Sequence, residues 1–183
     1  MLNINNKDLP LIIEALLLAA NNPMSIQDIM LIFDETERPT AKEIETAIAL
    51  LQQPKEPRGI ELVKVANGYQ FQSKQKFAHL VARLWQEKPA KYSRAFLETL
   101  ALIAYRQPIT RGEIEQIRGV TISQSIFKTL QEERGWIRVI GHKDVPGKPG
   151  LYATTKEFLT YFGLEKLEQL PPLPQVMEFL TAE

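Results

Sequence analysis

The sequence contains no cysteine, which excludes disulfide bonds, thiolate zinc sites and cysteine nucleophiles. It also lacks a charge excess, because 22 lysine and arginine residues balance 22 aspartate and glutamate residues. Free-standing nucleic-acid binders usually carry a basic excess. Histidine is scarce as well: His79 and His142 are the two in the chain, and neither has an adjacent carboxylate pair. With no glycine loop that opens a helix to cradle phosphate, we expect no enzyme and predict no catalytic, cofactor-binding or metal-ligating residues.

No hydrophobic run in the sequence is long enough to span a bilayer. The most apolar stretch, LPLIIEALLLAA, contains Glu14 and lacks the basic start and cleavage signature of a signal peptide. We therefore expect no membrane association and a cytoplasmic protein. Apolar residues still make up 44% of the 183 residues, enough for the packed core of one medium domain or of two small ones.

The stretch 97–120 predicts a helix, a tight corner and a second helix. Apolar residues recur at the spacing of a core-facing helix, at Leu97, Leu100, Ala101 and Ala104. Pro108 ends that helix, because it has no amide hydrogen to donate. Thr110 and Glu113 then form a capping box that starts the next helix, and Gly119 ends it. With a third helix capped by Ser123, this is the core of a helix-turn-helix fold.

The first half of the chain predicts the same unit. A helix over 9–20 is followed by a helix capped by Ser25 and Asp28, and by a third capped by Thr40 and Glu43. Two strands, 59–65 and 69–73, are joined through Asn67-Gly68, the strongest short hairpin signal. Three helices and a hairpin make a winged-helix domain, which we expect a helix over 74–86 to close.

The two halves are related by an internal repeat. The residues of the second capping box lie 85 positions after those of the first. At the same offset, the core stripe listed above corresponds to Ile12, Ala15, Leu16 and Ala19. The second half also ends in a hairpin, 136–141 to 151–155, with a longer tip. We predict a mainly α fold with small β-hairpin wings, as two tandem winged-helix domains.

The predicted domain boundaries follow from this repeat. They are an N-terminal winged helix over 1–86, a linker over 87–92, a C-terminal winged helix over 93–163, and an acidic, proline-rich tail over 164–183. The tail begins after a short helix that follows Thr155, and its prolines favour extended backbone. We expect a poorly ordered end there, with a proline-rich docking ligand as the alternative.

The first helix is apolar nearly all round, with Glu14 marking its one polar side. Such a helix needs burial on more than one face, and a domain this small hardly supplies both. We therefore predict a homodimer through the N-terminal domain, with an interface formed by Leu11, Ile13, Leu17 and Leu18. The alternative is that the closing helix over 74–86 covers the extra face within one chain.

DNA binding is the other function that a winged helix suggests. In the first domain the third helix carries acidic residues beside an acidic loop, which would repel phosphates. The second domain could make a weak contact to the phosphate backbone through Lys128, Arg138, Lys143 and Lys148. A solvated, charged wing explains the same residues. A winged-helix DNA-binding transcriptional regulator is thus the alternative function.

Over 96–120, the sequence FLETLALIAYRQPITRGEIEQIRGV resembles the bacterial segregation and condensation protein B family. The resemblance continues through PGKPGLYATT in the second wing and the FGL…L..LPPLP tail, and so covers essentially the whole chain. Two departures from the family pattern are VTISQS after Gly119, where a small-residue link is expected, and the absence of a longer acidic extension.

The resemblance implies a non-catalytic, cofactor-free subunit of the SMC–kleisin condensin complex. It would homodimerise through its N-terminal domains and bind the kleisin, segregation and condensation protein A, which bridges the SMC ATPase heads. DNA contact would then be weak or indirect. Its role would be chromosome condensation and segregation during cell division, in a cytoplasmic, nucleoid-associated location.

Polar residues in 97–120 that the fold does not obviously require are our candidates for kleisin binding: Tyr105, Arg106, Gln107, Arg111 and Arg118. Structural explanations exist for several of them. Tyr105 could complete the core, Arg111 and Arg118 could be solvated surface charges, and Gln107 could simply precede Pro108.

Overall fold

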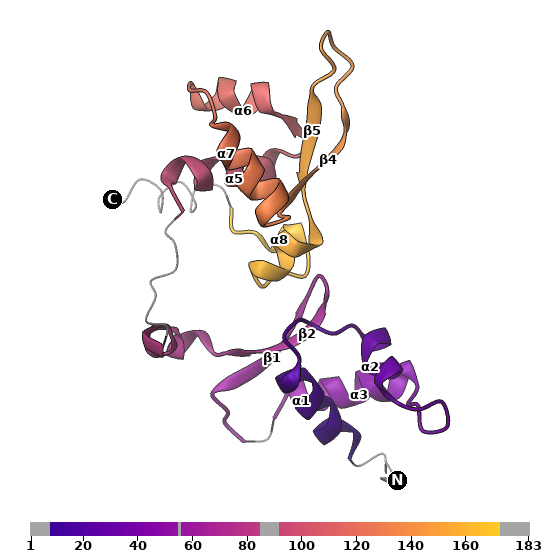
Figure 1. Cartoon of the computed structure of the whole chain (residues 1–183). Helices are drawn as coiled ribbons and strands as arrows, with labels where there is room; N and C mark the ends of the chain where they lie inside the picture. The colour runs from indigo at the N-terminus through magenta and orange to yellow at the C-terminus, as the bar shows by residue number, and fades with distance from the viewer. Residues whose placement is uncertain (1–7, 55, 85–91, 173–183) are drawn as a thin grey trace. The chain divides into compact units, whose positions relative to one another are not determined.

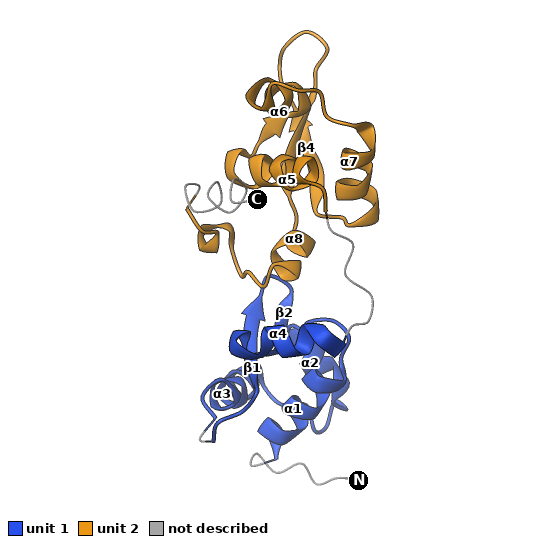
Figure 2. Ribbon diagram, turned by 90° about the vertical axis from the view of Figure 1, so that its left-hand side faces the viewer, with its two compact units in different colours: residues 1–87 blue, residues 88–183 orange. Residues whose placement is uncertain are grey.

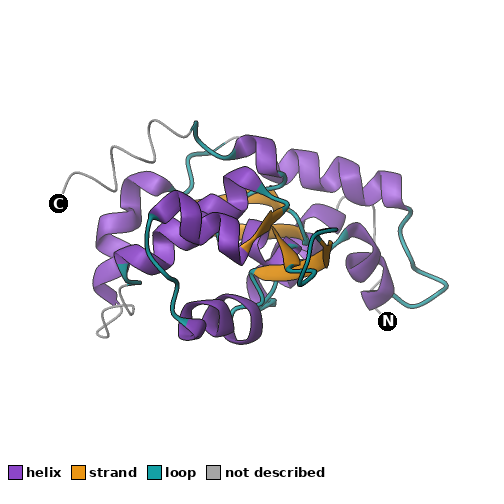
Figure 3. Ribbon diagram, turned by 90° about the horizontal axis from the view of Figure 1, so that it is seen from above, coloured by secondary structure: helices purple, strands orange, loops and turns teal. Residues whose placement is uncertain are grey.

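A computed structural model describes residues 8–54, 56–84 and 92–172. The chain divides into two compact units, residues 1–87 and 88–183 (Figure 2). Each unit combines several helices with a small antiparallel sheet (Figure 3). The predicted linker, 87–92, lies outside the described residues except for its last position. Within the described ranges, no helix has the length and apolar character needed to cross a membrane.

The first unit begins with three helices (Figure 1): α1 over Leu9–Ala19, α2 over Ile26–Ile32 and α3 over Ala41–Gln52. Both predicted capping boxes are confirmed. The backbone amide of Ser25 donates to the Asp28 carboxylate at 2.8 Å, and that of Thr40 donates to the Glu43 carboxylate at 2.8 Å. Helix α3 buries four apolar residues in the core of this unit: Ile44, Ala47, Ile48 and Leu51.

The wing of the first unit pairs β1, Ile60–Val65, with β2, Gly68–Ser73. The predicted hairpin is confirmed, but Val65 pairs with Gly68, so its turn is Ala66-Asn67. Gly68 serves another purpose: at φ 133°, a Cβ there would lie 2.3 Å from the backbone of Met24. Met24 bonds in both directions with Tyr69, at 3.0 and 2.9 Å. Glycine thus lets β2 approach the segment before α2.

The predicted closing helix is wrong in its form. In place of one long helix the chain makes a 3-10 turn over Gln75–Phe77, α4 over Ala78–Val81, and another 3-10 turn over Ala82–Leu84. The last two predicted positions, 85 and 86, lie outside the described residues. The described part of this segment contributes no residue to the buried core cluster of the first unit.

The second unit has α5 over Arg94–Arg106, α6 over Arg111–Arg118 and α7 over Gln124–Lys128, which continues as a π-helical turn over Thr129–Glu133. The capping box at the start of α6 is confirmed, and Gly119 ends that helix with φ 69°. A three-stranded antiparallel sheet orders β3, Ile109–Thr110, then β5, Gly150–Thr154, then β4, Ile137–His142. The β4–β5 hairpin extends as a long ribbon beyond the helices (Figure 1).

After the wing, Thr155 caps α8, Lys156–Tyr161, as predicted. The chain then turns back, because Gly163 has φ 69° and the Leu164 amide donates to the Leu159 carbonyl at 2.7 Å. Three leucines beyond this turn pack half-buried against the core of the second unit: Leu164, Leu167 and Leu170. The expectation of a poorly ordered end is thus wrong for 164–172. The remainder of the tail, 173–183, lies outside the described residues.

The internal repeat is real, but its register changes along the chain. The residue before each cap pairs with the second wing strand in both units, as Met24 with Tyr69 and as Ile109 with Tyr152. The buried stripes of the first helices are Leu9, Ile13 and Leu17 in α1, and Phe96, Leu100 and Ala104 in α5. These stripes lie 87 residues apart, whereas the caps lie 85 apart.

The turn before the second helix accounts for the difference of two residues. Helix α1 ends six residues before its following cap at Ser25, and α5 ends four before Thr110. Two residues rotate a helix by about 200°, so the offset of 85 assigned the wrong face of α1 to the core. The predicted stripe Ile12, Ala15, Leu16 and Ala19 is half-buried at Ile12 and Leu16 and exposed at the two alanines.

Candidate protein-interaction surfaces

The outer face of α1 carries apolar side chains that its own unit leaves uncovered. Leu11 is 64% exposed and Leu18 is 54% exposed. Both were predicted to lie in a subunit interface, and both are available for one. The alternative of cover from the closing segment does not hold for these two side chains.

The other two predicted interface residues lie in the core. Ile13 is 0% exposed and Leu17 is 4% exposed, because they continue the buried stripe that begins at Leu9. Their assignment to a surface was wrong and followed from the misplaced helix register. The polar side of α1 is closed within the unit, since Glu14 accepts a hydrogen bond from Arg58 at 2.6 Å.

Further apolar side chains are exposed on the other helices of this unit. They lie on α2, on α3 and on the segment over 78–84, and comprise Leu31, Ile32, Leu50, Leu80 and Leu84. Isolated exposed leucines are common on proteins, but an accumulation of them on a small domain is typical of a contact surface. The first unit therefore exposes apolar side chains on several of its helices besides α1.

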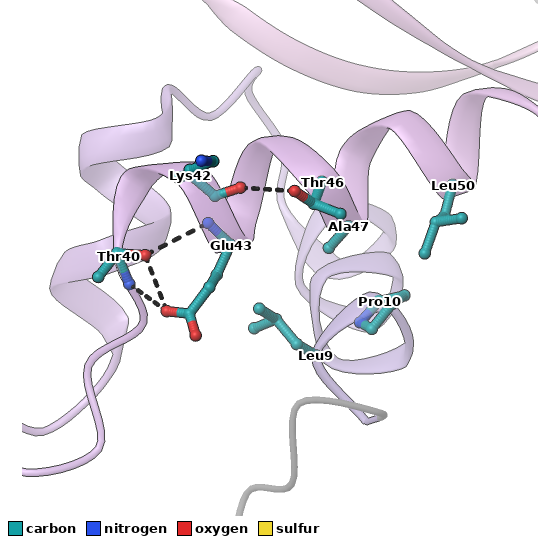
Figure 4. A pocket seen from close by; sticks show the side chains of 8 residues that line it. All are labelled: Leu9, Pro10, Thr40, Lys42, Glu43, Thr46, Ala47 and Leu50. Atoms are coloured by element: carbon teal, nitrogen blue, oxygen red, sulfur yellow. Dashed lines mark hydrogen bonds between the residues drawn. The ribbon is translucent and has the colours of Figure 1, made fainter.

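A groove of about 410 Å³ lies between the start of α1 and the side of α3 (Figure 4). Leu9 and Pro10 face Ala47 and Leu50 across it. Three of its polar side chains have local partners: Thr40 and Glu43 bond to each other, and the Thr46 hydroxyl donates to the Lys42 carbonyl at 2.8 Å. This groove thus offers mainly apolar contact.

In the second unit, Arg118 braces α6 against α5. Its side chain is only 9% exposed and donates to the Glu98 carboxylate at 3.1 Å and to the Thr99 hydroxyl at 3.3 Å. Glu98 also accepts from Arg94 at 2.9 Å, and hydrogen bonds from Arg94 and then Arg118 lower the pKa of its carboxyl. Arg118 is neither a solvated charge nor free to bind a partner.

Arg111 fastens the link between α6 and α7. It donates to Glu115 at 3.0 Å and to the backbone carbonyl of Ile122, and its guanidinium lies over the ring of Phe127, 5.5 Å from the centroid. The Ile122 amide donates to Glu115 at 2.9 Å, which together with Arg111 lowers the pKa of that carboxyl. Ile122 belongs to the VTISQS link and is buried. Both of its backbone groups are bound, the carbonyl by Arg111 and the amide by Glu115.

Gln107 and Tyr105 also have structural partners. The Gln107 side chain donates to the Ala104 carbonyl at 2.9 Å, and its carbonyl accepts from the Thr154 amide at 2.8 Å, which joins the end of α5 to β5. Tyr105 is half-buried, and its hydroxyl donates to the backbone carbonyl of Pro171 in the tail. Burial raises the pKa of this phenol. Neither side chain is free to bind a partner without breaking these bonds.

Arg106 differs from the other four candidates. Its side chain is exposed at the end of α5 and has no hydrogen bond or ion pair to any part of the chain that the structure describes. It borders a pocket of about 490 Å³ at the α5–α6 corner, together with Pro108, Ile109, Glu113, Gln116 and Ile117. We call this the corner pocket.

The sequence alone did not single out Gln116 and Ile117 as site residues. Ile117 lies 85 residues after Ile32, at the spacing of the capping boxes, and both side chains are exposed. An apolar position that is repeated in both units is the signal that could have identified Ile117; Gln116 has no such signal.

Of the four basic residues predicted to touch DNA, Lys143 is engaged within the unit. Its ammonium lies 2.6 Å from the Glu113 carboxylate. This bond, with those from Thr110, lowers the pKa of Glu113 to about 2. Lys128, Arg138 and Lys148 are exposed, and their side chains form no hydrogen bond or ion pair within the described ranges. In those same ranges, no group of three or more histidine, aspartate and glutamate side chains could hold a metal ion.

Comparison with known proteins gives consistent results. The family model for the segregation and condensation complex subunit ScpB matches residues 11–173. The chain is 49% identical to the segregation and condensation protein B homolog of Coxiella burnetii, over 94% of this chain and 82% of that protein. It is 42% identical to segregation and condensation protein B of Syntrophotalea carbinolica, over 96% and 87% respectively.

One solved structure is described as the dimer of the ScpB N-terminal domain complexed with ScpA peptide. It is 29% identical in sequence with a TM-score of 0.38, and the match covers 43% of this chain and 96% of that chain.

Proposed function

The chain belongs to the family of the segregation and condensation complex subunit ScpB, and from this premise we infer that it is a non-catalytic subunit of a bacterial condensin. The match spans both units, so the premise applies to the whole tandem fold. A complex subunit acts through surfaces that bind other chains. The observation that carries the proposal is the apolar surface of the first unit, above all Leu11 and Leu18.

The first unit is proposed to form the homodimer. Leu11 and Leu18 lie seven residues apart on one helix, and therefore on the same face, two turns apart. An isologous interface brings this face against its own copy. The groove between α1 and α3, lined in part by Leu50, offers further apolar contact in the same unit.

The kleisin, segregation and condensation protein A, is the proposed partner, and the SMC ATPase is reached through it. The chain would thereby act in chromosome condensation and segregation, at the nucleoid in the cytoplasm. DNA contact is proposed to be weak or indirect, which agrees with the balanced charge of the chain and with the pairing of Lys143 to Glu113.

Co-purification tests this function. Tagged full-length chain, expressed in its own host, is expected to retain the kleisin and the SMC subunit through washes at moderate salt. Recovery of neither subunit, from cells that contain both, would contradict the proposal. A DNA-binding regulator would instead retain duplex DNA in vitro, with affinity that falls steeply as salt rises because counterions are released.

A further inference from the structure

We propose that the corner pocket of the second unit binds an acidic side chain of the kleisin, with an apolar neighbour of that acid against Ile117. This inference rests on the proposed function and deepens it by naming the chemistry that the partner supplies.

Arg106 is the cation that lines the corner pocket. The two arginines of α6 are occupied, Arg118 with Glu98 and Thr99 and Arg111 with Glu115 and Ile122. Arg106 lies at the end of α5, is exposed, and pairs with nothing in the described ranges. A guanidinium presents a planar set of donors that matches a carboxylate in a two-point contact.

Glu113 lines the same pocket, yet its carboxylate is already bound. One oxygen accepts from the Thr110 amide and hydroxyl, both at 2.8 Å, and the other accepts from Lys143 at 2.6 Å. The pairing with Lys143 balances its negative charge. The charge left uncompensated beside the pocket is the positive charge of Arg106, so the pocket favours an anion.

The remaining wall is apolar. Ile109 is buried behind the pocket, Pro108 is exposed at its edge, and Ile117 is 55% exposed on α6. A volume of about 490 Å³ has room for a carboxylate side chain and an apolar neighbour. Gln116 supplies an amide that can donate to the ligand. Arginine is one of the residue types enriched at the positions that contribute most to binding at interfaces.

The same corner of the first unit has a different chemistry. The residue 87 positions before Arg106 is Ala19, and the residues 85 positions before Gln116 and Ile117 are Leu31 and Ile32. Leu31 and Ile32 are both exposed, so these positions of the first corner are apolar. The equivalents of Arg106, Gln116 and Ile117 in the first unit thus supply no cation for an acid.

A charge-exchange experiment tests the proposal. The probes are synthetic peptides that cover the central segment of the kleisin from the same genome, each with one Asp or Glu changed to Lys. Binding is measured by fluorescence anisotropy to the full-length chain, to Arg106→Glu, and to the control Lys128→Glu. Lys128 is also exposed in the second unit, so the control makes the same charge reversal away from the pocket.

We expect Arg106→Glu to weaken the unmodified peptide about tenfold or more, and Lys128→Glu to leave it within about twofold. One Lys-substituted peptide should lose affinity for the wild-type chain and regain it with Arg106→Glu. Ile117→Ala should weaken the same peptide and leave the rescue intact. Circular dichroism is expected to show unchanged folding, because both side chains are exposed.

The alternatives are separable. Equal affinity of the unmodified peptide for wild-type chain and Arg106→Glu would overturn the inference and leave the proposed function standing. Weakening by Arg106→Glu without rescue by any substituted peptide would also overturn it, since the effect would then be a general one of net charge. Failure of every peptide, and of the intact kleisin, to bind the wild-type chain would contradict the proposed function itself.

Discussion

The two units share their caps and their core, and they differ in what covers the first helix. On α5 the outward positions are closed from within: Glu98 is held by Arg118, and Tyr105 bonds to the tail. The equivalent positions on α1, 87 residues earlier, are Leu11 and Leu18, and both are bare. The outward face of the first helix is thus bound by its own chain in the second unit and left apolar and exposed in the first. The open copy is therefore where a second subunit is expected.

The largest expected effect is a loss of stability when a side chain on the buried face of α1 is shortened, compared with one at an exposed apolar position. Ile13→Ala removes a side chain that is fully buried and should lower the unfolding free energy of the first unit by about 2–5 kcal/mol. The control Leu31→Ala, at an exposed position of α2, should stay within about 0.5 kcal/mol. Hydrogen exchange read by mass spectrometry resolves the two units, since peptides from 9–52 report on the first alone. Equal losses for the two variants would show that the assigned register of α1 is wrong.

A smaller loss of stability is expected at Gln107, which has a structural role, than at Ile13, and almost none at the neighbouring Arg106, which is proposed to bind the partner. Gln107→Ala removes the contacts to Thr154 and Ala104 and leaves the Thr154 amide without its partner, which should cost about 1–3 kcal/mol. Arg106→Ala should change stability by no more than about 0.5 kcal/mol. Urea denaturation followed by exchange of peptides from 94–162 measures both. A Gln107→Ala variant of unchanged stability would return that residue to the list of binding candidates.

The smallest expected effect is a titration. Lys143 holds the pKa of Glu113 at about 2, below its ordinary value of 4.5. The stability that this pair contributes is complete above pH 4.5 and is lost as the pH falls toward 2. Lys143→Met should raise the pKa of Glu113 toward its ordinary value, measured by carbon-13 NMR of the side-chain carboxyl.

The first unit supplies the control for this titration. Asp28 occupies the same capping position, and its pKa is lowered by bonds to Ser25 with no lysine involved. Its titration should not move in the Lys143→Met variant. A shift of Asp28 equal to that of Glu113 would mean that the substitution acts on the whole chain and not on one ion pair.

The capped helices could be predicted because their chemistry is local. In each of the three capping boxes, donor and acceptor are three residues apart, so the sequence alone shows both partners. The register of α1 could not be predicted this way. Its burial depends on the length of the turn before Ser25, and the caps do not reveal that length.

For the candidate site, the sequence indicated which polar residues the motif contains but not which of them are free to bind a partner. The motif is rich in polar residues, but their partners lie far along the chain. Arg118 bonds to Glu98 twenty residues away, and Gln107 bonds to Thr154 forty-seven residues away. Which arginine remains free is decided by that packing. The tail was misjudged for a similar reason: its prolines suggested an extended end, while its leucines pack against the core.

The most direct test of the account is the mass of the full-length chain in sedimentation equilibrium. Wild-type chain is expected at twice the mass of one chain, and the double variant Leu11→Glu, Leu18→Glu at the mass of one, with unchanged circular dichroism. Ile117→Glu, an equally exposed apolar position in the second unit, should remain dimeric. A double variant that is folded and still dimeric would contradict the claim that the bare face of α1 is the subunit interface.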